Sequence, residues 1–183
     1  MSTDFDPAYL QLVARWFGDP EPLWKDGRWL CYDADNYGIV IQTGGPRLKV
    51  FFNIFQNNRS GNGPDLICDS ATNVLKFLLY SAGTKWRQRQ GMDRILVPYS
   101  LQLVRPGFSI TPTPEGVRGE VAWTSEGSEH SATLAQDGHA VEFTYYGAAP
   151  LAQIRESMES ADGSPLFADV RKVPASSLEY ARP

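Results

Sequence analysis

The sequence predicts an α+β fold, in which an antiparallel sheet of about seven strands packs around one long central helix, with short helices near both ends. The central helix is expected at residues 68–83, because apolar residues recur there with the spacing of a single helical face. They are Val74, Leu75, Leu78, Leu79 and Ala82. Three strand-like runs precede this helix and four follow it. Burial of the apolar face would contribute roughly 8–15 kcal/mol of gross stabilisation, which is enough to anchor a fold.

The ends of the central helix are marked by residues that favour helix termini. Asp69 or Ser70 can accept hydrogen bonds from the first free amides. Gly83 can adopt the left-handed conformation that closes a helix. We therefore expect the helix to end at Gly83.

Composition and charge indicate one soluble domain that spans residues 1–183, with a core of about residues 7–168. A chain of 183 residues with 42% hydrophobic content is long enough for one well-buried core and short for two. The net charge of −4 argues against a general nucleic-acid binder. Two isolated cysteines, Cys31 and Cys68, suit a reducing cytoplasm better than a disulfide framework. No signal peptide or apolar run of bilayer length is apparent, so we expect a cytoplasmic protein and no membrane contact.

The first part of the chain predicts a short helix followed by an antiparallel meander. Asp6 can cap the helix, Pro7 suits its first position and Gly18 can stop it. The apolar side of this helix consists of Tyr9, Leu10, Val13, Trp16 and Phe17. Strands are expected at residues 28–33, 37–43 and 48–56, and residues 21–27 are interpreted as a connection. Short turn segments join the three strands, which favours antiparallel pairing.

The second half of the chain is interpreted as mostly extended. Strands are expected at residues 108–113, 119–124, 131–136 and 140–146. Asp137-Gly138 is expected to form a tight hairpin turn between the last two. Six acidic residues between Glu115 and Glu142 predict a negative outer face, which could steer a basic partner. A short helix is expected at residues 150–160, and residues 172–183 are expected to form a loose tail.

A basic segment follows the central helix and is the best candidate for partner contact. Residues 84–94 contain four basic side chains interleaved with Trp86, and tryptophan and arginine are favoured anchors in interfaces. The alternative is a solvated segment with Trp86 tucked beneath it. The polar loop at residues 57–65, which contains Arg59, is glycine-rich but lacks the motifs of a phosphate-binding loop.

The C-terminal third carries a recognisable arrangement of motifs. A strand at residues 141–144 is followed by a helix with Leu151 and Ile154, and then by the run Glu156-Ser157-Met158-Glu159-Ser160-Ala161-Asp162-Gly163-Ser164-Pro165-Leu166-Phe167. Further back lie Asp26-Gly27-Arg28 and Phe77-Leu78-Leu79-Tyr80-Ser81-Ala82-Gly83, the latter followed by the basic segment. Together these motifs resemble the actinobacterial immunity proteins of polymorphic toxin systems, the family that includes the immunity factor of the tuberculosis necrotizing toxin. The resemblance covers roughly residues 26–168.

The resemblance implies a bacterial antitoxin that binds a cognate toxin domain in the cytoplasm and blocks the active site of that domain. In the named member the toxin hydrolyses NAD, so an NAD-hydrolysing toxin is one candidate here. Immunity surfaces diverge with their toxins, so the toxin identity does not carry over. Tight blocking needs aromatic or arginine anchors, and our candidates by residue type and position are Arg59, Lys85, Trp86, Arg87 and Arg89.

No pattern in the sequence predicts a catalytic or metal site, so we expect no enzymatic activity and no cofactor. The two histidines, His130 and His139, lack the helical spacing or neighbouring cysteines of a metal site. A Gly-x-Ser-x-Gly nucleophile motif is absent. Two alternatives stay open, namely an enzyme of unfamiliar type and a small-ligand module with a pocket between the sheet and the central helix.

Overall fold

The computed structural model describes residues 4–34, 37–52, 63–113, 118–125 and 127–176. These residues form four α-helices and one short 3-10 helix. The α-helices are α1 (Pro7–Phe17), α2 (Ala71–Arg89), α3 (Asp137–Phe143) and α4 (Leu151–Glu159), and the 3-10 helix is η1 (Leu101–Leu103). Among the described residues, no helix is long and apolar enough to cross a membrane.

Eight strands form one antiparallel sheet in the order β1-β2-β3-β4-β5-β9-β8-β7. Their bounds are β1 Leu23–Lys25, β2 Arg28–Tyr32, β3 Gly38–Gln42, β4 Leu48–Phe52, β5 Leu66–Cys68, β7 Phe108–Pro112, β8 Gly119–Ser125 and β9 Ser128–Leu134. The short strand β5 joins the two halves of the sheet, because Leu66 pairs with Val50 of β4 on one side and with Leu134 of β9 on the other. A separate two-stranded sheet pairs β6 (Arg94–Leu96) with β10 (Arg171–Val173).

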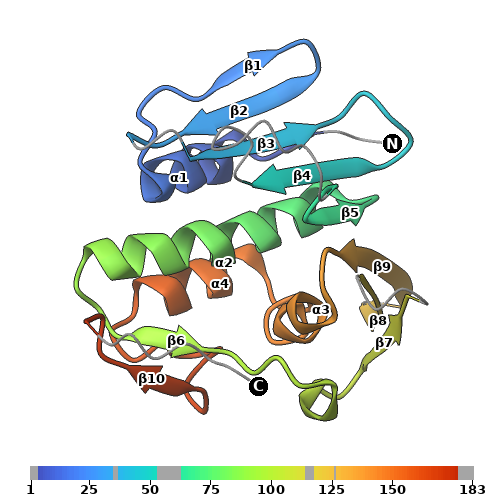
Figure 1. The fold of residues 1–183 in the computed structure, drawn as a ribbon, viewed down its shortest axis with the longest axis vertical. Coiled ribbons are helices and arrows are strands. Elements are labelled where there is room, and N and C mark those ends of the chain that lie inside the picture. Colours follow the sequence, from blue (N-terminus) through green and yellow to red (C-terminus); the bar gives the residue numbers. More distant parts are fainter. Residues whose placement is uncertain (1–3, 35–36, 53–62, 114–117, 126, 177–183) are drawn as a thin grey trace.

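Helix α2 is the central element of the fold. In Figure 1 it crosses the middle of the molecule, with β1 to β4 on one side and α3 and β6 on the other. It packs against both α1 and α4, and apolar side chains are buried almost all round it. The predicted fold class, an antiparallel sheet around one long helix with short helices near both ends, is confirmed.

The ends of α1 follow the predicted capping chemistry. The Asp6 carboxylate accepts a hydrogen bond of 2.8 Å from the amide of Ala8, and Pro7 occupies the first helical position. Gly18 has φ of 106°, the left-handed conformation that closes the helix. Local sequence therefore determines both boundaries of this helix.

The prediction that α2 ends at Gly83 is wrong, because the helix continues to Arg89. A Cβ atom on Gly83 would lie 2.7 Å from Cγ of Met158 in α4. The glycine therefore permits close packing of two helices and does not terminate one. At the other end the Ser70 hydroxyl caps the helix by accepting a hydrogen bond of 3.3 Å from the amide of Asn73. As a result, residues 84–89 of the predicted basic segment are helical.

The strand expected at residues 140–146 is also wrong, because residues 137–143 form α3. The predicted hairpin turn at Asp137-Gly138 is instead the first turn of this helix. Its Ala140 packs on Gly119 of β8, where a Cβ atom would lie 2.7 Å from Cβ of Ala140. Tertiary packing has thus overridden an alternating apolar pattern. Glu142, which we expected on the negative outer face of the sheet, belongs to this helix and lines the groove described below.

Four strands of three residues were not predicted, namely β1, β5, β6 and β10. β1 lies in the segment expected to be a connection, and β5 lies where the central helix was expected to begin. The third predicted strand is β4 as far as Phe52, and its expected remainder at residues 53–56 lies outside the described residues. β10 includes the first residues of the expected loose tail, whose residues 177–183 also lie outside the described part.

Candidate functional site

A groove of about 740 Å³ runs along one side of α2. Its lining comes from α2, from β6 and the segment after it, from α3, and from residues around β3 and β4. In Figure 1, β4 and β6 lie on opposite sides of α2, so the groove follows the face of α2 that lies between them. The groove is lined by apolar and aromatic side chains together with several charged groups, among them Asp33, Asp65, Lys85 and Glu142.

One end of the groove holds a lysine of the chain itself. The Lys85 ammonium forms a salt bridge with the Asp33 carboxylate. It also lies 4.2 Å from the ring centre of Phe17 and 5.3 Å from that of Tyr37. The amide of Tyr37 donates a hydrogen bond of 2.8 Å to Asp33, which orients the carboxylate. A carboxylate and two aromatic faces therefore enclose a cation at this end.

The other end of the groove contains a carboxylate held by tyrosines. Oε1 of Glu142 accepts hydrogen bonds of 2.7 Å from Tyr80 and 3.4 Å from Tyr99. The Tyr80 ring is fixed in turn by stacking on Tyr146, with 4.5 Å between ring centroids. Burial raises the pKa of Glu142 to about 7, although the two tyrosine hydrogen bonds act in the opposite direction. A substantial fraction of Glu142 is therefore protonated at neutral pH.

Two further ionisable groups line the groove near Glu142. Burial raises the pKa of Asp65, while the amide of Phe52 stabilises the charged carboxylate through a hydrogen bond of 2.8 Å. Burial lowers the pKa of His139, which keeps its imidazole neutral at physiological pH, although Asp65 favours the charged form. The ionisable side chains at this end are thus mainly acidic.

The predicted contact residues of the last two turns of α2 lie on different sides of the helix. Arg87 is only 1% exposed, and its guanidinium donates to the backbone carbonyls of Asp93, Met158, Ser160 and Ala161. These bonds join the C-terminal end of α2 to the end of α4. Burial lowers the pKa of Arg87, and nearby carboxylates partly offset this effect.

The neighbours of Arg87 attach α2 to α1. Trp86 stacks on Trp16 with 5.5 Å between ring centroids, and Arg89 donates a hydrogen bond to the carbonyl of Trp16. Trp86 is half-buried and Arg89 is exposed. Lys85 lines the groove, while Arg59 lies outside the described residues. The structure does not gather these candidates into one patch, and their contact role stays a prediction.

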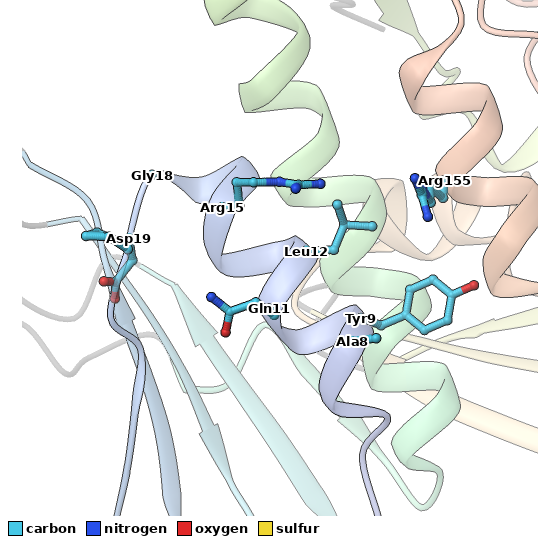
Figure 2. Close-up of a pocket in the computed structure, with 9 residues that line it drawn as sticks. Ala8, Tyr9, Gln11, Leu12, Arg15, Gly18, Asp19 and Arg155 are labelled. Atoms are coloured by element: carbon cyan, nitrogen blue, oxygen red, sulfur yellow. The ribbon is translucent and has the colours of Figure 1, made fainter.

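A second hollow lies between α1 and α4. It has a volume of about 810 Å³ and is lined mainly by α1 residues and Arg155. Figure 2 shows Tyr9, Leu12 and Arg15 projecting from α1 toward Arg155 of α4. Arg155 also forms an i, i+4 pair with Glu159 at 3.2 Å. Among the residues that line this hollow, there is no carboxylate held by several tyrosines, as there is at the Glu142 end of the groove.

Neither cysteine is poised as a nucleophile, and no metal cluster is formed by the part of the chain that the structure describes. Cys31 and Cys68 are buried free thiols. Burial raises the pKa of both, that of Cys68 to about 11, so each is a neutral thiol at physiological pH. Within the described residues, no three His, Cys, Asp or Glu side chains are placed to share a metal ion.

Sequence reasoning found Lys85 but missed Glu142, Tyr80 and Tyr99. Glu142 was missed because residues 140–146 were interpreted as a strand, which would have placed its side chain on an outer sheet face. Tyr80 was treated only as part of the helix, although its hydroxyl contacts a residue 62 positions later. The local sequence offers no helical signal for α3, because Val141, Phe143 and Tyr145 alternate with polar residues as in a strand.

Comparison with known proteins identifies the family. A sequence model of the family described as Immunity protein 61, or Imm61, matches residues 46–166. The chain belongs to the Imm61 family. The matched range extends from just before β4 to beyond α4, so it includes α2, Tyr99 and Glu142. The predicted resemblance to toxin immunity proteins is confirmed.

A solved structure shares the fold of this Imm61 protein. It is described as Rv3902c from M. tuberculosis and superposes with a TM-score of 0.72, at 19% sequence identity, over 91% of this chain and 95% of that chain. This likeness extends the shared fold beyond the range of the family match. No curated protein matches the chain.

Proposed function

We propose that this Imm61 protein binds a cognate toxin domain in the cytoplasm and blocks the active site of that domain, without catalysing a reaction itself. The observation that carries the proposal is the match to an immunity protein family over residues 46–166, which is well over half of the chain. An NAD-hydrolysing toxin is the candidate to test first, because of the sequence resemblance to the family of the necrotizing toxin's immunity factor.

The groove along α2 supports a binding role. It combines a volume of about 740 Å³ with aromatic walls and charged groups at both ends. Such a surface can accept projecting side chains of a partner and fix their orientation through charge. Lys85, which lines the groove, is a proposed contact residue, as are Trp86 and Arg89 on the side of α2 that contacts α1. Arg59, which lies outside the described residues, is proposed as well. We propose that Arg87 contributes to partner binding by holding the shape of this surface, since its own guanidinium is buried.

Co-expression tests the proposal directly. A candidate toxin domain, sought among the genes that flank the gene for this chain, would be expressed in a bacterial host with and without this protein. We expect the toxin alone to stop growth and the pair to restore it, with both chains co-eluting in size-exclusion chromatography. Growth arrest that persists in the presence of a stable, well-expressed Imm61 protein, together with separate elution, would reject the proposal.

A small-ligand module is the second candidate, and the position of the groove between the sheet and α2 favours it. A ligand that binds only the native state raises the unfolding temperature by mass action. We would screen a set of cationic, nucleotide and sugar metabolites by thermal shift. A saturable shift with one metabolite in a protein that binds no toxin would favour this second function.

A further inference from the structure

The two ends of the groove along α2 contain similar chemistry but are occupied differently. At one end, Asp33 and two aromatic rings surround the ammonium group of Lys85. At the other end, the Glu142 carboxylate is held by Tyr80 and Tyr99. Among the described residues, no lysine or arginine forms a salt bridge with Glu142. The first end therefore shows how this groove accommodates a cation, and the second lacks one from the described chain.

The hydrogen bonds of Glu142 leave one carboxylate oxygen for a ligand. Both tyrosine hydroxyls donate to Oε1. Oε2 receives no hydrogen bond from the described residues. Among the described residues, the side-chain polar atoms that are fully buried and lack a hydrogen-bond partner are Asp137 Oδ1 and Tyr146 Oη. Glu142 Oε2 is not one of them, so it is not fully buried. Since Glu142 lines the groove and is only partly buried, Oε2 keeps some exposed surface and is the oxygen that a group entering the groove would meet.

We propose that the Glu142 end of the groove is a socket for a guanidinium or ammonium group, contributed by an arginine or lysine side chain of the toxin. The choice of a toxin side chain rests on the proposed function. The choice of a cation rests on the site itself, and it would hold for any partner that presents such a group.

The surroundings of Glu142 favour a cation over an anion. Asp65 adds a second carboxylate to the lining, although the nearby charge of Arg118 partly offsets it, and His139 is kept neutral by burial. Tyr80 from α2 and Tyr99 from the segment after β6 provide aromatic rings and hydroxyl groups. A guanidinium here would form a charge-assisted hydrogen bond with Oε2 and contact an aromatic face.

The basic side chains in the groove lining are engaged elsewhere. Lys85 is paired with Asp33, and Arg87 donates to backbone carbonyls. Arg94 lies on β6 and forms no salt bridge with Glu142 in the described structure. None of the three satisfies Glu142.

The pKa of Glu142, about 7, gives this socket a measurable signature. A bound cation stabilises the charged carboxylate, so binding lowers the pKa and releases protons near pH 7. The groups that face Glu142 are Tyr80, Tyr99 and Tyr146, whose pKa values are all raised, so they stay neutral in this range. Calorimetry in buffers of different ionisation enthalpy would detect the released protons.

The decisive experiment compares wild type with Glu142→Gln, first in binding to the co-expressed toxin domain at pH 8. Glutamine keeps the side-chain shape and can still accept from the tyrosines, but it lacks the charge. We expect affinity at pH 8 to fall about tenfold or more and the proton release near pH 7 to disappear. Glu120→Gln, an exposed residue of β8, is the matched control and should leave affinity within about twofold.

A second measurement separates the socket from the proposed function. Nuclear magnetic resonance titration would compare N-acetyl-arginine amide with its uncharged isostere, N-acetyl-citrulline amide. We expect the arginine probe to shift signals of Tyr80, Tyr99 and Glu142 in wild type only, and the citrulline probe to shift neither protein. Thermal unfolding would verify that the variant is folded.

The outcomes distinguish the two claims. If the toxin binds wild type and Glu142→Gln equally well, the socket is rejected and the immunity function stands. If no toxin complex forms but the arginine probe binds wild type specifically, the socket stands and the proposed function fails. Equal binding of arginine and citrulline probes would also overturn the socket.

Discussion

Arg87 shows how a single charged side chain can join several elements. Its guanidinium is buried and donates to four backbone carbonyls from the segment after α2 and the end of α4. Those carbonyls would lose their donors if the side chain were shortened. A buried polar network of this kind is strongly destabilised when one partner is removed.

We therefore expect Arg87→Ala to lower the free energy of unfolding by about 3–5 kcal/mol. Arg155→Ala is the control, because Arg155 is exposed and its pair with Glu159 joins adjacent turns of α4. That control should cost less than about 0.5 kcal/mol. Urea unfolding followed by circular dichroism would measure both, and a loss below about 1 kcal/mol for Arg87→Ala would contradict the structural role.

The raised pKa of Glu142 predicts that the stability of the protein decreases as the pH rises. Burial raises its pKa from the ordinary value of 4.5 to about 7 in the folded protein. Between these values the native state holds a proton that the unfolded chain releases. The free energy of unfolding of wild type should therefore fall as pH rises from about 4.5 to 7, by up to about 3 kcal/mol from this group.

Comparison with Glu142→Gln isolates this contribution from that of every other titrating group. The free energy of unfolding of the variant should not show this decline with pH. The difference between variant and wild type should therefore change in favour of the variant as the pH rises from 5 to 8. Urea midpoints at pH 5, 6, 7 and 8 provide the measurement. Parallel curves for the two proteins would show that Glu142 titrates normally.

At the scale of elements, the contact of α2 with α4 depends on Gly83. A Cβ atom there would lie 2.7 Å from Cγ and 2.9 Å from Cε of Met158. Alanine normally favours a helix over glycine by about 1 kcal/mol. Here the crowded interface opposes that gain, because Met158 is fully buried.

We expect Gly83→Ala to destabilise the protein by about 1–2 kcal/mol in wild type. In a Met158→Ala background, where space is available, the same change should stabilise it. A double-mutant cycle of unfolding free energies measures the coupling between the two positions. Additive effects would show that the two side chains do not compete for space.

The elements that sequence predicts well are those specified by local chemistry. Helix α1 has its Asp6 cap, its Pro7 start and its Gly18 end within the segment from residue 6 to residue 18. Strands β2, β3 and β8 also lie close to their expected positions. In each case a local signal agrees with the tertiary structure.

The elements that sequence misses depend on distant partners. β5 has only three residues and is defined by pairing with β4 and β9. α3 is helical because its buried face packs on β8, whereas its local pattern alternates like a strand. The Glu142 end of the groove could not be predicted for the same reason, since it requires α2, α3 and the segment around Tyr99 to be placed correctly.

At the scale of the whole molecule, the sheet and the helices create a groove beside α2 with a charged site at each end. Arg87 and Trp86 attach α4 and α1 to the same helix, so they fix the body around which the groove is formed. A rigid surface loses little conformational entropy on binding, which favours tight inhibition of a partner. This body, and membership of Imm61, support an inhibitor that acts by occlusion.

Occlusion predicts a specific inhibition curve, and its measurement tests the central claim most directly. The purified toxin domain would be assayed at fixed concentration while this protein is added at increasing molar ratio. We expect toxin activity to decline linearly and to vanish near one molar equivalent of this protein. For variants that bind more weakly, excess substrate of the toxin should reduce the inhibition. Full toxin activity in the presence of a large excess of folded Imm61 protein would contradict the proposal.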